Sequence, residues 1–415
     1  ARLRLMSANY PAVAEALALG KGVVPLPLPP SVEQELHRSL RVAAEARSLI
    51  AGPAGANGTL PYGAVPAGSR TWISHATGST YAFNCLLQNW ALSVARFGAI
   101  GAHLITLCLD EPAHAACSEA ASTRSASLEC LNASEYGAQL QALAQATSST
   151  YGERARDLYF AFTWAKPAIV WAASRGGFPV VYCDLDVIWH TPLGLPPDSE
   201  TFAMRTGNSG LVVAPAHSEI VRRWYEAGRA GRYTWRREDV RFDKLSVKTA
   251  VAGGGGGGSG GGAMRGRWVN CCDQDALVGV LEHDAQTDDH RTLPHVIWPP
   301  RMIPECGTGV RRPQVLAVHY NCIGSETSSD RMLDKAREMR RNRQWLVTNG
   351  TCAGFPESGR KLLRMHNVTR NGVRRVPTRA GTAGYSTQGR YNRLLGLSRS
   401  RRAGGTASLK TLRTL

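Results

Sequence analysis

The sequence lacks the features that would place it in several common classes. Its ten cysteines include no Cys-x-x-Cys pair, which argues against a structural zinc site. It also lacks a long uninterrupted apolar run. The longest apolar region, Ala91 to Leu109, is broken by Arg96 and His103, so it predicts helix, turn and strand rather than a membrane span. Because the sequence opens on Ala1 rather than methionine, we expect a preceding segment that carries a signal or a membrane anchor.

Acidic residues are scarce at the carboxyl end. From Pro356 to Leu415 there are 14 Lys and Arg against a single acid, Glu357, so this segment supplies +13 of the net charge of +17. The remaining +4 is ordinary for a globular protein, and nucleic-acid binding is therefore not expected as the main role. Residues 351–415 are predicted to be a basic disordered tail. A polyanion-binding role for this tail stays open as an alternative, and deletion of residues 356–415 would test it.

The sequons and cysteines together indicate the secretory pathway. Four of the thirteen asparagines lie in Asn-x-Ser/Thr sequons, namely Asn57, Asn132, Asn349 and Asn367. With an even number of cysteines, this favours an oxidising lumen where some cysteines form disulfides. The sequence does not say which cysteines pair.

Composition divides the chain into a central domain with flanking segments. Residues 1–67 contain a proline cluster and a predicted helix, Ser31–Ile50, and are interpreted as a stem or, alternatively, as a helix packed on the domain. The domain itself is predicted to span residues 68–350. Within it, residues 228–267 carry charge runs and polyglycine, which predict a flexible insertion.

From Arg70 onward, predicted strands alternate with predicted helices. The strands are Thr71–His75 and Ala102–Leu109, and the helices are Tyr81–Phe97 and Arg154–Ala173. Such alternation predicts an α/β fold with a mostly parallel sheet and ligand chemistry at the carboxyl ends of its strands. Asp110 lies at one such end, directly after the second strand.

The run Val180–Trp189 is apolar and β-branched, and it is interrupted by Asp184 and Asp186. Carboxylates are costly to bury without a counter-charge, and on an extended strand these two would point to the same side. A pair so placed suits a hard divalent cation such as Mg²⁺ or Mn²⁺. The alternative is that the two aspartates cap a helix or pair with arginines.

Three further segments carry candidate polar residues, each with an ordinary structural alternative. The turn containing Asn208 and Gly210 suits the presentation of backbone amides to a ligand, or is a hairpin turn. Asp273 and Gln274 open an apolar helix, where Asp273 is a candidate N-cap or sugar contact. His319 ends the predicted strand Val315–Asn321 and is a structural histidine or a third metal ligand.

Taken in order, these motifs resemble the nucleotide-diphospho-sugar transferase family, which includes plant and algal arabinosyltransferases of cell-wall glycoproteins and pectin xylosyltransferases. The resemblance covers about residues 70–346. It is carried by the Asp-Leu-Asp-Val-Ile-Trp strand, the upstream Lys166-Pro167 helix, the Asn208-Ser209-Gly210 turn, the Asp273–Leu277 helix and His319-x-Asn321. The sequence departs from the family at one point: a lysine is expected soon after the histidine, and the next one here is Lys335.

The resemblance implies a GT-A fold, with a Rossmann-like mostly parallel sheet and flanking helices. It also implies a UDP-sugar donor, Mn²⁺ or Mg²⁺, a glycoprotein or cell-wall polysaccharide acceptor, and retention of anomeric configuration. The implied location is the Golgi lumen, as a type II membrane protein. A catalytically silent lumenal protein that binds nucleotide-sugars or glycans is the alternative.

The resemblance also implies a role for each candidate residue. Asp186 and His319 would bind the metal, and Asp184 would bind the metal or the ribose. Asp110 would hold uridine or ribose, and Asn208 and Gly210 would contact the nucleotide-sugar. Asp273 and Gln274 would sit near the anomeric carbon, where they orient the acceptor hydroxyl or stabilise an oxocarbenium-like centre.

Overall fold

The computed structural model of the chain describes residues 10–20, 22–51, 71–77, 81–98, 103–124, 128–148, 151–190, 200–233, 273–284, 293–305, 315–321 and 331–347. The chain divides into two compact units, Ala1–Arg375 and Val376–Leu415, and all described residues belong to the first. The predicted basic tail lies outside the described residues.

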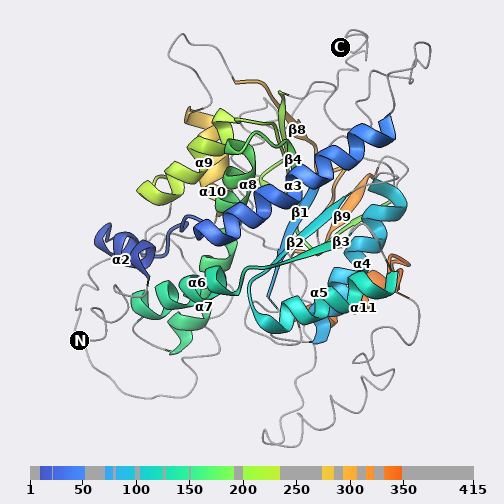
Figure 1. Cartoon of the computed structure of the whole chain (residues 1–415), viewed down its shortest axis with the longest axis horizontal. Helices are drawn as coiled ribbons and strands as arrows, with labels where there is room; N and C mark the ends of the chain where they lie inside the picture. The colour runs from blue at the N-terminus through green and yellow to red at the C-terminus, as the bar shows by residue number, and fades with distance from the viewer. Residues whose placement is uncertain are drawn as a thin grey trace, which may run out of the picture. The chain divides into compact units, whose positions relative to one another are not determined.

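Seven strands form one sheet in the order β3-β2-β1-β4-β7-β6-β8 (Figure 1). Their bounds are β1 Thr71–Ala76, β2 Leu104–Cys108, β3 Leu128–Asn132, β4 Val180–Cys183, β6 Phe202–Arg205, β7 Asn208–Ala214 and β8 His295–Trp298. Within this sheet only β7 runs against its neighbours, because it pairs antiparallel with both β4 and β6. The predicted α/β fold with a mostly parallel sheet is confirmed.

Buried side chains cover both faces of this sheet. Along β1, Trp72 and Ile73 belong to two different hydrophobic clusters, as the period-two alternation of a strand requires. Sheets buried on both faces are typical of strands connected by helices, since the crossover helices lie over the faces. The core therefore has two layers with the sheet between them.

The helices divide between the two faces of the sheet. The cluster with Ile73 is packed by α3 Pro30–Ala51, α6 Ser134–Thr147, α7 Tyr151–Thr163, α8 Ala165–Arg175 and α9 Glu219–Ala230. The cluster with Trp72 is packed by α4 Tyr81–Ser93 and α5 Glu111–Arg124. A third, smaller cluster joins α4 to α11 Arg331–Arg341 through Leu86 and Met339.

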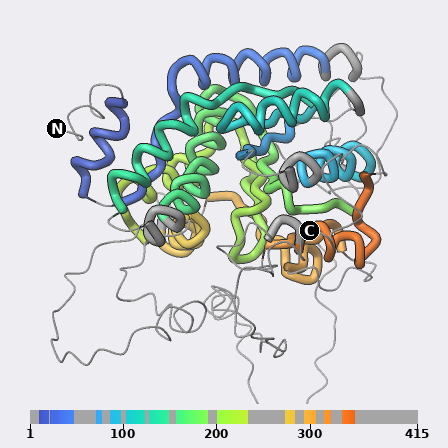
Figure 2. Tube along the Cα trace, turned by 90° about the horizontal axis from the view of Figure 1, so that it is seen from below, coloured from blue at the N-terminus to red at the C-terminus, as the bar shows by residue number. Residues whose placement is uncertain are grey.

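The helix predicted at Ser31–Ile50 is α3, and it packs on the domain. Its apolar face, formed by Val32, Leu36 and Leu40, is buried in the same cluster as Ile73. Figure 1 shows α3 crossing in front of the sheet, where it contacts β1, β3 and α8. Figure 2 shows the same helix along the outer side of this layer. The shorter helix α2, Pro11–Ala18, also contributes to the cluster.

The helix predicted at Arg154–Ala173 is two helices, and this part of the prediction is wrong. α7 ends at Thr163 and α8 begins at Ala165. Pro167 has no N–H with which to bond the Thr163 carbonyl, and its ring would clash with that carbonyl in a continuous helix. The break allows α8 to bring Lys166 to Asp184, just past the end of β4.

Helix α9 reaches Ala230, past the predicted start of the insertion at residue 228. It begins at the N-cap Ser218, whose hydroxyl accepts a hydrogen bond from the Val221 amide at 3.3 Å. It ends at Gly231, which takes a left-handed conformation with a φ of 65°. Residues 234–267 of the insertion lie outside the described residues.

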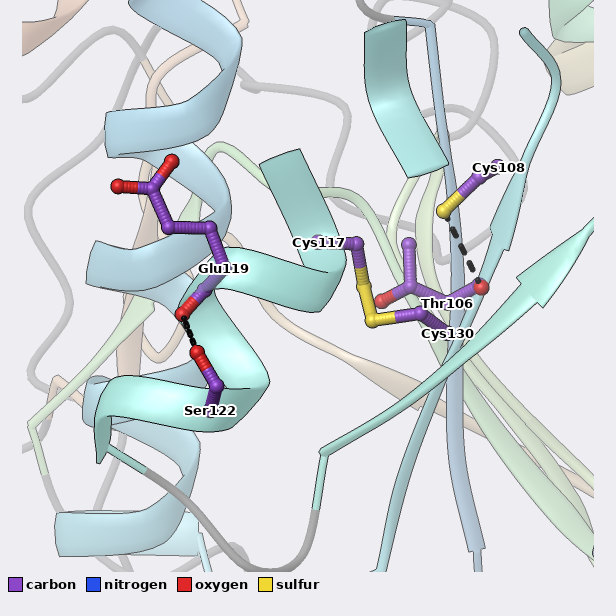
Figure 3. The surroundings of a disulfide bond; sticks show 6 residues. All are labelled: Thr106, Cys108, Cys117, Glu119, Ser122 and Cys130. Atoms are coloured by element: carbon purple, nitrogen blue, oxygen red, sulfur yellow. Dashed lines mark hydrogen bonds between the residues drawn. A yellow bond between two sulfur atoms is a disulfide. The ribbon is translucent and has the colours of Figure 1, made fainter. Parts of the chain in front are cut away.

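One disulfide joins Cys117 of α5 to Cys130 of β3 (Figure 3). It ties a helix on one face of the sheet to the strand at its edge. Cys108 and Cys183 are buried free thiols. None of the helices in the described part of the chain is long and apolar enough to span a bilayer.

Candidate functional site

The predicted strand Val180–Trp189 is broken at the two aspartates. β4 ends at Cys183, and β5 runs from Val187 to Trp189. Between them the chain turns, and the Val187 amide donates to the Asp184 carbonyl at 3.1 Å. The expectation that Asp184 and Asp186 share one side of an extended strand is therefore wrong. A turn places them together instead, just past the carboxyl end of β4.

His319 joins the two aspartates because β5 pairs with β9, Ala317–His319. In this antiparallel pair Val187 lies opposite His319. The His319 Nε2 atom is 3.1 Å from Asp186 Oδ1 and 3.8 Å from Asp184 Oδ2. The three side chains offer ligand atoms that all lie within 4.8 Å of one another. The structure thus brings together the three residues predicted from sequence as metal ligands.

This donor set fits a divalent cation. Two carboxylates and an imidazole suit Mn²⁺ or Mg²⁺ by ligand chemistry, and three protein donors leave coordination positions for the oxygens of a substrate. The group lies at the carboxyl end of a parallel strand, where ligands bind in open α/β sheets. Asp186 and His319 are both buried, so a cation there would be shielded from bulk water.

Two buried lysines neutralise these carboxylates. Lys166 of α8 donates to Asp184 Oδ2 at 2.8 Å, and Lys335 of α11 donates to Asp186 Oδ2. Burial works against ionisation of Asp186, but Lys335 and His319 outweigh it and hold the pKa of this carboxyl well below its usual range. The resemblance leads one to expect a lysine soon after His319, whereas the next lysine, Lys335, is 16 residues further along the sequence. Helix α11 brings it back.

Lys166 also links Asp184 to Asp273. Its Nζ atom is 3.8 Å from Asp273 Oδ2, and the Ser209 hydroxyl donates to the same oxygen at 2.5 Å. Burial raises the pKa of the Asp273 carboxyl, and Lys166 and Ser209 oppose that rise. Burial likewise disfavours the Lys166 ammonium, but Asp184 and Asp273 outweigh it and raise its pKa. Lys166 is therefore a permanent cation between two acids.

The second oxygen of Asp184 is held from the opposite direction. The Tyr182 hydroxyl lies 3.0 Å from Asp184 Oδ1 and 2.8 Å from His75 Nδ1. Burial lowers the pKa of His75 to about 4, so this histidine is neutral at neutral pH. The chain His75–Tyr182–Asp184 spans β1 and β4 and fixes the orientation of the carboxylate.

Gly210 allows the closest approach in the site. A Cβ atom at this position would lie 2.3 Å from Cε1 of His319, so any side chain would displace the imidazole. The Gly210 carbonyl accepts from the Asp184 amide at 2.8 Å, and the Gly210 amide donates to Asn208 Oδ1 at 2.7 Å. Gly210 was predicted to lie in a turn, but it belongs to strand β7 and positions Asp184 and His319. Its contact with a nucleotide-sugar stays a prediction.

Asn208 belongs to a polar cluster around Glu305. The Glu305 Oε1 atom accepts hydrogen bonds from Asn208 Nδ2 at 2.7 Å, Asn321 Nδ2 at 3.0 Å and Arg205 Nη1 at 2.6 Å. A parallel bridge pairs Glu305 with His319. No pattern in the sequence singled out Glu305, whose partners lie about one hundred positions away at Arg205 and Asn208.

Asp273, Gln274 and Asp110 occupy helix starts. Asp273 opens α10, Asp273–Gly279, is 3 % exposed, and accepts a hydrogen bond from the Gln274 backbone. Gln274 is partly exposed beside it. Asp110 follows β2 and accepts from the Ala113 amide at 2.8 Å, which caps α5. β2 lies two strands from β4, about 10 Å across the sheet, so Asp110 is separate from the aspartate pair.

Comparison with known proteins gives weak structural similarities. Mouse xyloside xylosyltransferase 1 in its apo form aligns with 61% of this chain and 98% of its own, with 11% identity and a TM-score of 0.36. The apo structure of the bifunctional glycosyltransferase WbbM aligns with 70% of this chain and 53% of its own, with 11% identity and a TM-score of 0.35. The galactosyltransferase LgtC, in complex with donor and acceptor sugar analogs, aligns with 68% of this chain and 99% of its own, with 10% identity and a TM-score of 0.35.

No family model and no curated protein matches this chain. Similarities at these identities and TM-scores do not assign a function, so the site geometry has to carry the proposal.

Proposed function

We propose that this chain is a metal-dependent glycosyltransferase of the GT-A type. It moves a sugar from a UDP-sugar to a glycoprotein or cell-wall polysaccharide acceptor, with retention of configuration. The single observation that carries the proposal is the convergence of Asp184, Asp186 and His319 at the carboxyl end of β4. The sequence resemblance supplies the donor class, the acceptor class and the stereochemistry.

The residues around this group suit the departure of a diphosphate. A cation bound by Asp186, His319 and Asp184 would act as a Lewis acid on the charge that develops on the leaving diphosphate. Lys166 keeps Asp184 and Asp273 paired with a cation, so both acids stay oriented in a buried site. Asp273, next to Gln274, is the candidate that orients the acceptor hydroxyl or stabilises positive charge at the anomeric carbon.

The compartment belongs to the proposal as well. A disulfide between Cys117 and Cys130 suits an oxidising lumen rather than a reducing cytosol. Together with the four sequons, this supports a lumenal location on the secretory pathway, for which we propose the Golgi. Deglycosylation of the natural protein, followed by mass measurement, would test whether the sequons are occupied.

The test of activity is UDP release by the full chain from UDP-arabinose, UDP-xylose and UDP-galactose, with Mn²⁺ or with chelator. We expect release from one donor, which chelator abolishes and which Asp186→Asn reduces by about 100-fold or more, because a bound cation supplies several kcal/mol of charge stabilisation. Asp157→Asn is the matched control, since Asp157 is a buried aspartate in α7 that bonds Ser148 outside the site. Release that persists in chelator and in Asp186→Asn would refute the proposal.

A catalytically silent nucleotide-sugar-binding protein is the second candidate. The observation that favours it is the lysine on each aspartate, since Lys166 and Lys335 already compensate the charge that a metal would neutralise. Calorimetry separates the two candidates. UDP-sugar binding without UDP release, across a broad acceptor panel, would support the silent protein and contradict transfer.

A further inference from the structure

Lys335 has an unusual place for a lysine beside a metal-binding group. It is 5 % exposed, and its ammonium lies on Asp186 Oδ2. The other oxygen of Asp186 lies 3.1 Å from Nε2 of His319. Both oxygens of this carboxylate therefore have protein partners.

The helix that carries Lys335 is fastened to the domain. Beyond α11, the Asn342 side chain donates to the Tyr320 hydroxyl at 3.1 Å. Asn89 of α4 donates to the Gln344 carbonyl at 3.2 Å and accepts from the Leu346 amide at 2.6 Å. These contacts anchor the chain just beyond α11, so the flexible side chain of Lys335 is the part that moves most easily away from Asp186.

Since like charges in a buried site repel strongly, a divalent cation bound to Asp186 and an ammonium on the same carboxylate oppose each other. Resting on the proposed function, we infer that Lys335 is a tethered cation that competes with the divalent metal for Asp186. The ammonium supplies positive charge to the same carboxylate that the metal would bind. A metal on either oxygen of Asp186 therefore binds more weakly while Lys335 is charged and in place.

Competition of this kind weakens the metal site. Lys335 holds Oδ2 of Asp186, so a metal that takes this oxygen must displace the ammonium, and a metal on Oδ1 is repelled by it. In both cases part of the binding free energy of the metal is lost to Lys335. The lysine is not a metal ligand, because an ammonium has no lone pair. Its effect is therefore on metal affinity, and it is measurable without donor, acceptor or turnover.

The test is calorimetric titration of the full chain with Mn²⁺. Lys335→Met removes the competing charge, and we expect the Kd for Mn²⁺ to fall about tenfold or more. Lys335→Gln keeps a hydrogen-bond donor for Asp186 but no charge, so it should also lower the Kd for Mn²⁺. It replaces the methionine variant if that variant does not fold. Lys335→Arg keeps the charge and should bind Mn²⁺ no more tightly than the wild type.

Arg337→Met is the matched control. Arg337 lies on the same helix but pairs with Asp334 at the surface, so its loss removes one positive charge without touching Asp186. We expect its Kd to stay within about twofold of the wild type, since exposed charges are screened. If Arg337→Met and Lys335→Met increased the affinity for Mn²⁺ equally, the net charge of the chain and not competition at Asp186 would set that affinity. This result would overturn the inference.

Unchanged affinity in both Lys335→Met and Lys335→Gln, or no Mn²⁺ binding by any variant, would also overturn it. The outcome is separable from that of the proposed function. If Lys335→Met tightens Mn²⁺ binding while no donor releases UDP, the inference about Lys335 is supported and the proposed transferase activity is refuted. If release depends on metal but Lys335→Met leaves the affinity unchanged, only the competition falls.

Discussion

Replacing Lys166 with methionine removes the cation that joins Asp184 to Asp273. The ammonium lies 2.8 Å from one carboxylate and 3.8 Å from the other, in a region where its side chain is 10 % exposed. Removing one partner of a buried ion pair costs about 3–5 kcal/mol, because the remaining charge is buried without compensation. Asp184 keeps some contact with water, so we expect a loss near the lower end, about 3 kcal/mol.

The assay is urea unfolding of the full chain, followed by circular dichroism. Arg175→Met is the matched control: Arg175 lies on the same helix and pairs with Glu33, but its side chain is 40 % exposed. Surface pairs contribute about 0–1 kcal/mol, so this variant should lose less than 1 kcal/mol.

A second variant tests the assignment to Asp273. Adding Asp273→Asn to Lys166→Met removes one of the stranded charges, so the double variant should lose less stability than the sum of the two single variants. A loss below about 1 kcal/mol in Lys166→Met, or strict additivity in the double variant, would refute the reasoning that Lys166 balances both acids.

Three further predictions follow from single features of the structure. The pKa of His75 is about 4 in the folded chain against 6.5 in the unfolded chain, so the free energy of unfolding should fall by up to roughly 3 kcal/mol as pH drops from about 6.5 to about 4. In urea unfolding curves measured over this pH range, His75→Phe should make the free energy of unfolding depend less on pH. An unchanged pH dependence would contradict the low pKa of His75. Gly210→Ala should weaken Mn²⁺ binding by about tenfold or more, because its Cβ atom would displace the His319 imidazole, and calorimetry showing wild-type affinity would rule this out. The double variant of Cys117→Ala and Cys130→Ala should unfold with about 3 kcal/mol less stability, as expected for a disulfide closing a short loop, and an unchanged urea midpoint would argue against the bridge.

The sequence predicts the sheet and the aspartate pair well, because both are local signals. Apolar β-branched runs between amphipathic segments give strands and helices, and two acids inside such a run require a counter-charge. The route by which Asp184 and Asp186 meet was mispredicted. Two acids one residue apart are compatible with a strand and with a turn. The pairing of β5 with β9 decides in favour of the turn, and it involves residues about 130 positions apart in the sequence.

Lys335 and Tyr182 escaped sequence reasoning for different reasons. Lys335 reaches Asp186 across 149 positions through the packing of α11, and a lone lysine in a basic helix carries no local mark of burial. Tyr182 sits in the middle of an apolar strand and reads as a core residue, although its hydroxyl bonds Asp184. The break between α7 and α8 was also missed, although Pro167 is a local signal from which it could have been predicted.

The central claim is that Asp184, Asp186 and His319 bind one divalent cation that holds a nucleotide diphosphate. Anomalous diffraction from crystals grown with Mn²⁺ and UDP tests this most directly. We predict one strong anomalous peak within coordination distance of the Asp186 carboxylate and His319 Nε2, with diphosphate oxygens completing the metal's coordination. Bound UDP with no anomalous peak beside Asp186 and His319 would contradict the claim.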